Sequence, residues 1–120
     1  MAIKTRIPPL ETTWLPLHTV CAFEALAEQM GVSTVARGPD GFLEQYDAVN
    51  GNPEALQTVW YSRNQSWWQR RNGFVRRHLA QMLKQQEAWW MNNGHPTRRH
   101  LALIMWAYSP DPASVERAMR

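Results

Sequence analysis

A row of basic side chains spaced by seven residues is the feature of the sequence best suited to a chemical role. The row consists of Arg63, Arg70, Arg77 and Lys84. On a continuous helix these cations point the same way along roughly 30 Å, with Arg71 and Arg76 on their flanks and no acid among them. Such a face neutralises phosphates, and phosphate contacts hold a protein on nucleic acid with little preference for sequence. We therefore predict that the protein binds DNA or RNA. The predicted phosphate contacts are Arg63, Arg70, Arg71, Arg76, Arg77, Lys84, Arg98 and Arg99.

Two aromatic residues, Trp67 and Phe74, fall beside this row on the helical wheel, away from the core-facing side. In one interpretation they pack against a second neighbouring element, and the arginine stems lie across them. In the other they are partly exposed and stack on the bases of a single strand, whose phosphates meet the arginines. We favour packing, because large apolar side chains are seldom exposed unless they are used. The candidate stacking or interface residues are Trp67, Phe74, Trp89 and Trp90.

A second basic group, Arg98, Arg99 and His100, opens a predicted helix that follows Pro96. Positive charge is unfavourable at a helix N-terminus, and a bound phosphate would relieve it while meeting free backbone N–H groups. The alternative is that Glu87, or an acid from the first half of the chain, neutralises this group. Both interpretations stay open at this point.

The charge of the chain changes sign at its middle. Residues 1–60 contain three basic and seven acidic side chains, a balance of −4, whereas residues 61–120 contain ten basic and three acidic ones, a balance of +7. This asymmetry favours an anionic partner for the basic half. The same asymmetry is also consistent with electrostatic attraction between the acidic and basic halves of one chain, or between the opposite halves of two copies. The alternative function is therefore a protein-interaction module, in which tryptophan and arginine anchors meet an acidic protein or form a homo-oligomer.

Other side chains that could do chemistry do not form a recognisable site. The nearest pair of histidines, His95 and His100, has no carboxylate close by in the sequence, as a metal site would need. Cys21 is interpreted as a small buried hydrophobe, and Glu24 with Glu28 as a solvated helix face. The sequence has neither a Gly-rich phosphate loop nor a nucleophile elbow. We therefore predict a binding protein and not an enzyme, with no cofactor and no metal.

The sequence predicts a cytoplasmic protein without a membrane partner. Its single cysteine cannot form an intrachain disulfide. The longest apolar run, residues 101–108, is far shorter than the roughly 20 residues that span a bilayer. Residues 1–9 lack the apolar stretch of a signal peptide.

The elements that position these side chains are predicted to be helices. With 120 residues, 44% of them hydrophobic, the chain fits one domain. Prolines around Trp14 make residues 1–15 an extended arm, and residues 16–120 form a single helical domain. Apolar spacings of three and four place helices at 19–30, 41–49, 54–62, 65–88, 96–108 and 113–120. Gly73 is a candidate break in the longest, and no segment alternates like a strand. The predicted fold is a compact all-α domain of five or six helices with an extended N-terminal arm.

Overall fold

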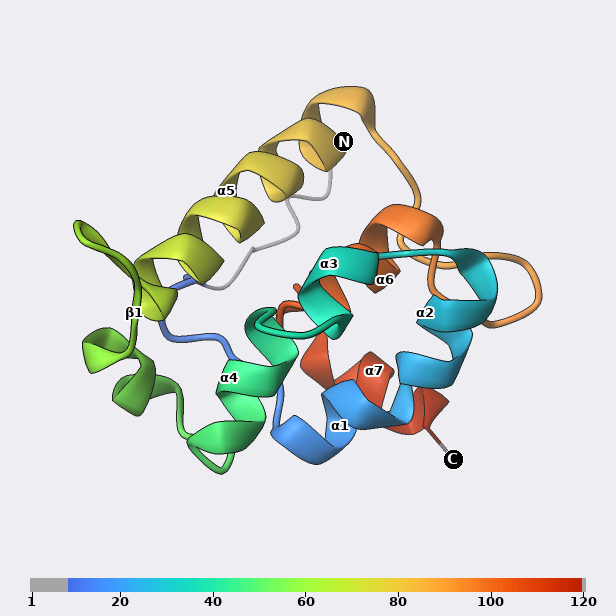
Figure 1. Ribbon diagram of the computed structural model, residues 1–120. Helices are drawn as coiled ribbons and strands as arrows, with labels where there is room; N and C mark the ends of the chain where they lie inside the picture. The colour runs from blue at the N-terminus through green and yellow to red at the C-terminus, as the bar shows by residue number, and fades with distance from the viewer. Residues whose placement is uncertain (1–8, 120) are drawn as a thin grey trace.

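A computed structural model describes residues 9–119, and Figure 1 shows an assembly of helices with one small β-hairpin. In chain order the elements are α1 (Leu17–Ala22), α2 (Glu24–Met30), α3 (Thr34–Arg37), α4 (Phe42–Ala48), the 3-10 helix η1 (Pro53–Thr58), β1 (Trp60–Ser62), β2 (Gln65–Ser66), α5 (Trp67–Gln85), α6 (Arg98–Ile104) and α7 (Pro112–Ala118). The mostly helical fold is confirmed, with seven α-helices in the described part of the chain where five or six were expected. None of these helices is long and apolar enough to cross a membrane.

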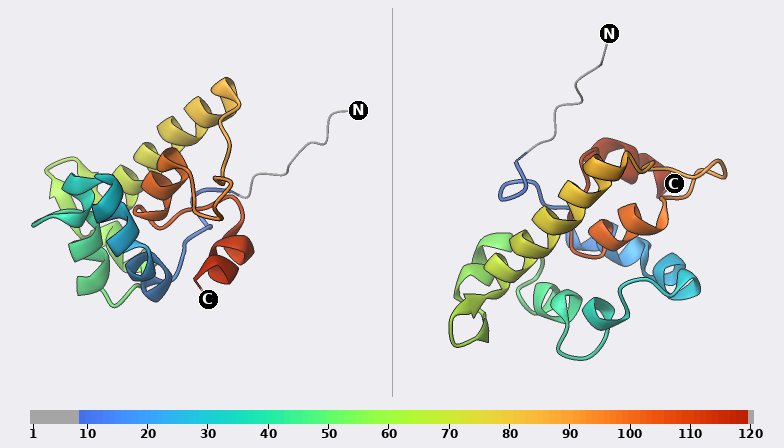
Figure 2. Two further views of the ribbon diagram at one scale, coloured as in Figure 1. Left: turned by 90° about the vertical axis from the view of Figure 1, so that its right-hand side faces the viewer. Right: turned by 90° about the horizontal axis from the view of Figure 1, so that it is seen from above.

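The longest helix, α5, presents an apolar side to the core. It begins with a capping box, in which Ser66 Oγ accepts from the Gln69 N–H and Gln69 Oε1 accepts from the Ser66 N–H. Val75, Leu79 and Met82, which share one side of the helix, are buried, and Trp68 on the same side is half-buried. Figures 1 and 2 show α5 lying along one side of the molecule, with α6 beneath it. Because one side of α5 is buried, the direction in which its basic residues face is fixed.

The segment predicted as a helix over 54–62 is instead η1 followed by β1. β1 pairs antiparallel with β2, with Trp60 opposite Ser66. The run of Val59, Trp60 and Tyr61 explains the strand, because β-branched and aromatic side chains fit extended backbone. The expectation that the chain contains no strand is therefore wrong at this position.

Two other predicted helices are shorter than expected. The helix over 19–30 is divided into α1 and α2 at Phe23, whose backbone (φ −100°, ψ 0°) leaves the helical region while its side chain is buried. Gly31 ends α2 in the left-handed conformation, with φ at 66°, which glycine adopts readily because it has no side chain. The helix over 96–108 ends early, as α6. Residues 105–109 are nevertheless buried, so the chain stays in the core after the helix ends.

The predicted N-terminal arm is partly built into the core. Residues 1–8 of that arm lie outside the described residues. Residues 9–15 form neither helix nor strand, as predicted, but they do not stand apart from the domain. Leu15 is buried and donates its N–H to the carbonyl of Ala107 at 2.8 Å, and the Trp14 ring stacks on Trp68 with centroids 5.3 Å apart.

An aromatic column joins α4, α5 and the segment after α6. It consists of Phe42, Trp106, Phe74 and His78. Successive ring centroids lie 4.9, 4.4 and 4.0 Å apart, and successive planes are inclined by 25°, 19° and 24°. Stacking of this kind stabilises more than the buried area alone. The column therefore fixes α5 against the middle of the molecule and carries one titratable ring, His78, at its end.

Candidate functional site

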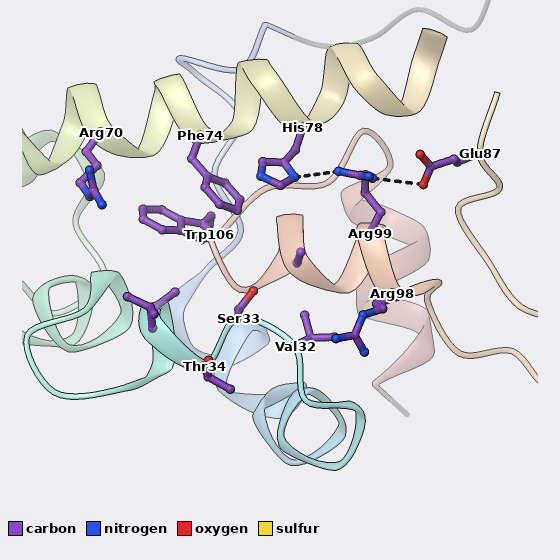
Figure 3. A pocket seen from close by; sticks show the side chains of 13 residues that line it. Val32, Ser33, Thr34, Arg70, Phe74, His78, Glu87, Arg98, Arg99 and Trp106 are labelled. Carbon is purple, nitrogen blue, oxygen red and sulfur yellow. Dashed lines mark hydrogen bonds and ion pairs between the residues drawn. The ribbon is translucent and has the colours of Figure 1, made fainter. Parts of the chain in front are cut away.

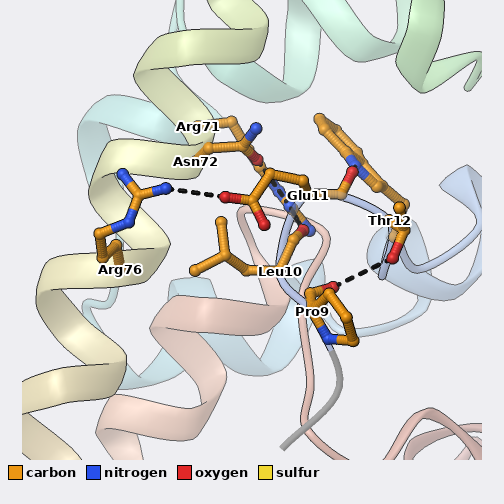
Figure 4. A network of polar contacts seen from close by, with 8 residues as sticks. Pro9, Leu10, Glu11, Thr12, Arg71, Asn72 and Arg76 are labelled. Carbon is orange, nitrogen blue, oxygen red and sulfur yellow. Dashed lines mark hydrogen bonds and ion pairs between the residues drawn. The ribbon is translucent and has the colours of Figure 1, made fainter.

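Arg71 is not on the surface, and its prediction as a phosphate contact is wrong. The side chain is 0% exposed, and Figure 4 shows it where α5 meets the N-terminal segment. Its guanidinium donates to Asn72 Oδ1 and to the backbone carbonyls of Leu10, Thr13, Trp106 and Ala107. Burial lowers the pKa of Arg71 to about 9, so the group is still a cation at neutral pH. Arg71 is therefore a structural cross-link.

Arg76 is exposed, but an acid from the first half of the chain faces it. Its Nη2 lies 2.8 Å from Oε1 of Glu11, and the side chains are 60% and 48% exposed (Figure 4). An exposed ion pair contributes little to stability. It does offset the positive charge that Arg76 presents to an external anion.

The row of cations spaced by seven is shorter in the structure than on the wheel. Arg63 lies in the hairpin, before α5 begins, so only Arg70, Arg77 and Lys84 share the helix. Arg63, Arg77 and Lys84 are exposed, and no side chain between residues 9 and 119 forms an ion pair with them. The sequence of α5 contains no acid. These three cations are therefore available to an anion from outside.

Two exposed aromatic residues lie on the same hairpin as Arg63. Trp60 is 62% exposed and Tyr61 is 47% exposed, and the guanidinium of Arg70 lies 3.8 Å from the centroid of the Tyr61 ring. Neither aromatic residue was among the candidates predicted from the sequence. The signal that could have revealed them is the run of Val59, Trp60 and Tyr61 just before Asn64, which is typical of a strand that enters a turn.

The aromatic residues predicted as stacking or interface anchors have intramolecular contacts instead. Trp67 is 5% exposed and packs against the aromatic column, which confirms the packing interpretation and excludes Trp67 as a surface anchor. Phe74 is half-buried within the column. Trp89 and Trp90 are also half-buried, and each ring packs edge-on against His100, at 5.2 and 5.0 Å.

A pocket of about 600 Å³ opens between α3, α5 and α6 (Figure 3). It is lined by Arg70 from α5, by Arg98 and Arg99 from α6, and by one acid, Glu87. The remaining lining residues are Val32, Ser33, Thr34, Val35, Ala36, Phe74, His78, Ala102 and Trp106. The structure thus brings Arg70 together with Arg98 and Arg99, which lie far from it in the sequence, around an apolar cavity.

Arg99 connects three polar side chains at one end of this pocket. Its Nε donates to Glu87 Oε1 at 3.1 Å, and its Nη1 donates to His78 Nδ1 and to Gln81 Oε1, each at 3.0 Å (Figure 3). Because a guanidinium can only donate, Nδ1 of His78 accepts, and the neutral ring carries its proton on Nε2. Burial, and then the charges of Arg99 and Arg77, lower the pKa of His78. His78 is therefore uncharged at neutral pH.

Arg98 lies at the other edge of the pocket and meets no acid in the described part of the chain. Its guanidinium donates to the carbonyls of Met30 and Gly31, at the end of α2. A cation is favourable at the C-terminus of a helix. The basic group at the start of α6 is thus neutralised by Glu87 only at Arg99, as one interpretation expected, whereas Arg98 retains an unpaired positive charge.

His100, the third member of that group, is a buried part of the core. Its Nδ1 donates to the carbonyl of Trp89 at 2.8 Å, and its Nε2 accepts from Ser109 Oγ at 2.9 Å. Burial lowers the pKa of His100 to about 4. Ser109 Oγ also accepts from the Asp111 N–H at 3.1 Å. This histidine–serine pair resembles an activated nucleophile in composition, but both residues are buried, and here the pair ties α6 to the start of α7.

The remaining polar candidates lie apart. Cys21 is exposed on α1, so its interpretation as a buried hydrophobe is wrong. Within residues 9–119, no three side chains of His, Cys, Asp or Glu come together as a metal site would need.

No protein-family model matches the chain, and no curated protein matches its sequence at a significant level. The function is therefore inferred from the surface and the pocket themselves.

Proposed function

We propose that the protein binds single-stranded nucleic acid across the hairpin and the adjoining side of α5. The surface that would bind the strand, named here the basic–aromatic surface, consists of Trp60, Tyr61, Arg63, Arg70, Arg77 and Lys84. On this surface the phosphates meet the cations of α5 and the hairpin, and the bases stack on the exposed rings. Binding of this kind depends strongly on salt and weakly on sequence.

The observation that carries the proposal is the exposure of Trp60 and Tyr61 beside unpaired cations. Large aromatic side chains are seldom left in solvent without a use, and here two adjacent ones lie on the same hairpin as Arg63. Every nucleobase has a flat apolar face, so such rings accept any base. Exposed rings on the hairpin, next to a helix that carries cations and no acid, therefore favour single-stranded nucleic acid over a neutral ligand.

A second candidate function is protein binding at the same place. β1 has exposed side chains throughout, and its two aromatic residues would be suitable anchors for an acidic partner or a second copy of the chain. Such an interface would rest mainly on buried apolar area. Its affinity would therefore depend less on salt than that of a surface that neutralises several phosphates.

The test is fluorescence anisotropy with labelled single- and double-stranded DNA and RNA, over a series of salt concentrations. We expect the single strands to bind more tightly than the duplexes, with a slope of log affinity against log salt of about 0.7 per phosphate contact. Trp60→Ala should weaken binding by roughly tenfold to a hundredfold, the equivalent of about 1–3 kcal/mol per stacked base, with little change in slope. No binding at low salt to any of the four nucleic acids would overturn the proposal.

A matched pair of charge reversals locates the surface. Arg77→Glu removes a cation from the basic–aromatic surface, whereas Arg117→Glu makes the same change at an exposed position on α7. We expect Arg77→Glu to weaken binding and to reduce the salt slope, and Arg117→Glu to do neither to a comparable extent. Equal effects would mean that only the net charge of the protein matters.

A further inference from the structure

The pocket between α3, α5 and α6 has a wall made of aromatic rings. Figure 3 shows Phe74 between Trp106 and His78 along one side of the cavity, with Arg99 next in the same row. Because Phe74 is stacked on both faces, a ligand in the cavity meets ring edges at this residue. The edge of an aromatic ring carries the positive part of its quadrupole. This wall is therefore both apolar and favourable to negative charge.

The charges around the pocket are unbalanced. Arg99 forms an ion pair with Glu87 at 3.1 Å, whereas no acidic side chain among residues 9–119 forms an ion pair with Arg70 or Arg98. With His78 neutral, two positive charges are left facing the cavity. Arg70 and Arg99 are partly buried, so an anion near them interacts more strongly than it would in water, whereas Arg98 is exposed.

The polar groups that face the cavity are mainly hydrogen-bond donors. Nη2 of Arg99 has no hydrogen-bond partner among the described residues, because Nε and Nη1 make the three bonds of that side chain. Figure 3 shows the hydroxyl of Ser33 directed into the cavity from the opposite side, and it too makes no hydrogen bond within residues 9–119. In the one carboxylate, Glu87, Oε1 accepts from Arg99, whereas Oε2 is buried without a hydrogen-bond partner among the described residues. The donors outnumber this one free acceptor, so the pocket is complementary to a group that accepts hydrogen bonds.

Size and composition narrow the ligand further. A cavity of about 600 Å³ lies within the usual range of about 300–1,000 Å³ for small-molecule sites. Val32, Ala36 and Ala102 give it apolar surface opposite and beside the rings. Desolvating one negative charge here costs less than desolvating the two of a phosphate ester. A planar carboxylate also matches the fork of a guanidinium.

We propose that this pocket binds a small aromatic carboxylate, with its ring system against Phe74 and Ala102 and its carboxylate at Arg99 and Arg98. The site goes beyond the proposed binding of nucleic acid, because it lies between three helices and shares only Arg70 with the basic–aromatic surface. Apolar contacts with the ring system position the ligand, and the arginines favour a ligand that carries a negative charge.

The test uses the full chain and three probes of one shape. 2-Naphthoate, the uncharged 2-naphthalenemethanol and 2-naphthyl phosphate are titrated in ¹H–¹⁵N and histidine-ring NMR experiments and by calorimetry. We expect saturable binding of naphthoate, with shifts at Ser33, His78 and Ala102, and at least tenfold weaker binding of the alcohol. No saturable shift, or equal binding of the alcohol, overturns the proposal. Tighter binding of the phosphate overturns the choice of a carboxylate.

Two variants locate the site. Ala102→Trp fills the pocket from α6, whereas Ala25→Trp adds the same ring at an exposed position on α2. We expect Ala102→Trp to weaken naphthoate binding at least tenfold and Ala25→Trp to leave it within twofold. If Ala102→Trp unfolds, Arg98→Gln replaces it, with an expected loss of about tenfold. Unchanged affinity in a folded pocket variant overturns the site. Nucleic-acid binding by Ala102→Trp is measured in parallel, and we expect no change there, so the two proposals can fail separately.

Discussion

Arg99 donates a hydrogen bond from Nη1 to Nδ1 of His78 at 3.0 Å, and this contact determines which nitrogen of the imidazole carries the proton. Protonation of His78 would place a second donor against the guanidinium and a second charge beside it. The pKa of His78 is lowered accordingly, with burial as the larger cause and Arg99 the next. The ring therefore works as a neutral member of the pocket wall.

The first prediction concerns this contact. Arg99→Gln removes the positive charge while keeping a side chain that can donate, so we expect the pKa of His78 to rise toward its ordinary value of 6.5. An NMR titration of the histidine ring signals measures it. Arg117→Gln, which removes a distant exposed cation, is the control and should leave the His78 signal where it is. A His78 pKa that does not move in Arg99→Gln would show that the charge of Arg99 does not contribute to the lowered pKa.

The second prediction concerns stability at acid pH. An unfolded chain takes up a proton at His100 near pH 6.5, whereas in the folded protein burial lowers its pKa to about 4. Between these values the unfolded state binds more protons, so the free energy of unfolding falls as the pH falls. The loss over this range is about 3 kcal/mol.

Urea unfolding at about pH 7, 5.5 and 4.5 measures this dependence. His100→Asn has no proton to gain, so its stability should change much less over the same range, although it starts lower because the Ser109 contact is lost. The same pH dependence in both proteins would assign it to other groups.

The third prediction concerns the buried cation. Arg71→Met removes a donor from four backbone carbonyls, and three of them, those of Leu10, Thr13 and Trp106, are left without any donor, since Ala107 still accepts from Leu15. An unsatisfied buried polar group costs about 1–3 kcal/mol. We expect the variant to lose more than about 3 kcal/mol in the free energy of unfolding. Arg77→Met, the same change at an exposed site on α5, should alter it by less than about 0.5 kcal/mol. Urea unfolding compares the two, and similar midpoints would contradict the role given to Arg71.

The fourth prediction contrasts two glycines. A Cβ at Gly41 would lie 2.3 Å from the carbonyl oxygen of Val35 and 2.6 Å from that of Ala36, so Gly41→Ala must push α3 away from α4. α5 continues through Gly73, where the predicted break does not occur and a Cβ meets only the end of the Arg77 side chain at 3.4 Å.

Thermal unfolding of both glycine variants provides the measurement. Gly41→Ala should lower the midpoint clearly, because backbone atoms cannot yield as a flexible side chain can. Gly73→Ala should raise stability by about 0.5–1 kcal/mol, the gain expected in a helix interior. A destabilised Gly73→Ala would show that the Arg77 side chain cannot move aside.

The helical elements could be predicted from the sequence because their apolar residues recur at helical spacings. The buried side of α5, at Val75, Leu79 and Met82, follows from this periodicity alone. The hairpin was missed because β1 and β2 together cover five residues, too few for an alternating pattern to emerge. The division of α1 from α2 depends on how Phe23 is buried, which is a property of the tertiary packing.

The candidate surface could be predicted only in part. The helical wheel identified Arg77 and Lys84 correctly as exposed cations, since it needs no knowledge of neighbours on that side. It misplaced Arg71 because nothing in the local sequence reveals that the carbonyls of residues 10, 13, 106 and 107 converge on one guanidinium. The pocket escaped prediction for the same reason, since α3, α5 and α6 are distant in the chain.

The bonds of Arg71 also constrain when the protein can fold during its synthesis. Two of its acceptors, Trp106 and Ala107, are translated 35 and 36 residues after the arginine itself. While Trp106 and Ala107 are still inside the ribosome, the nascent chain already contains Arg71 but lacks two of the carbonyls that accept its hydrogen bonds in the core. We therefore expect α5 to dock against the core only after residues 106 and 107 have emerged from the ribosome.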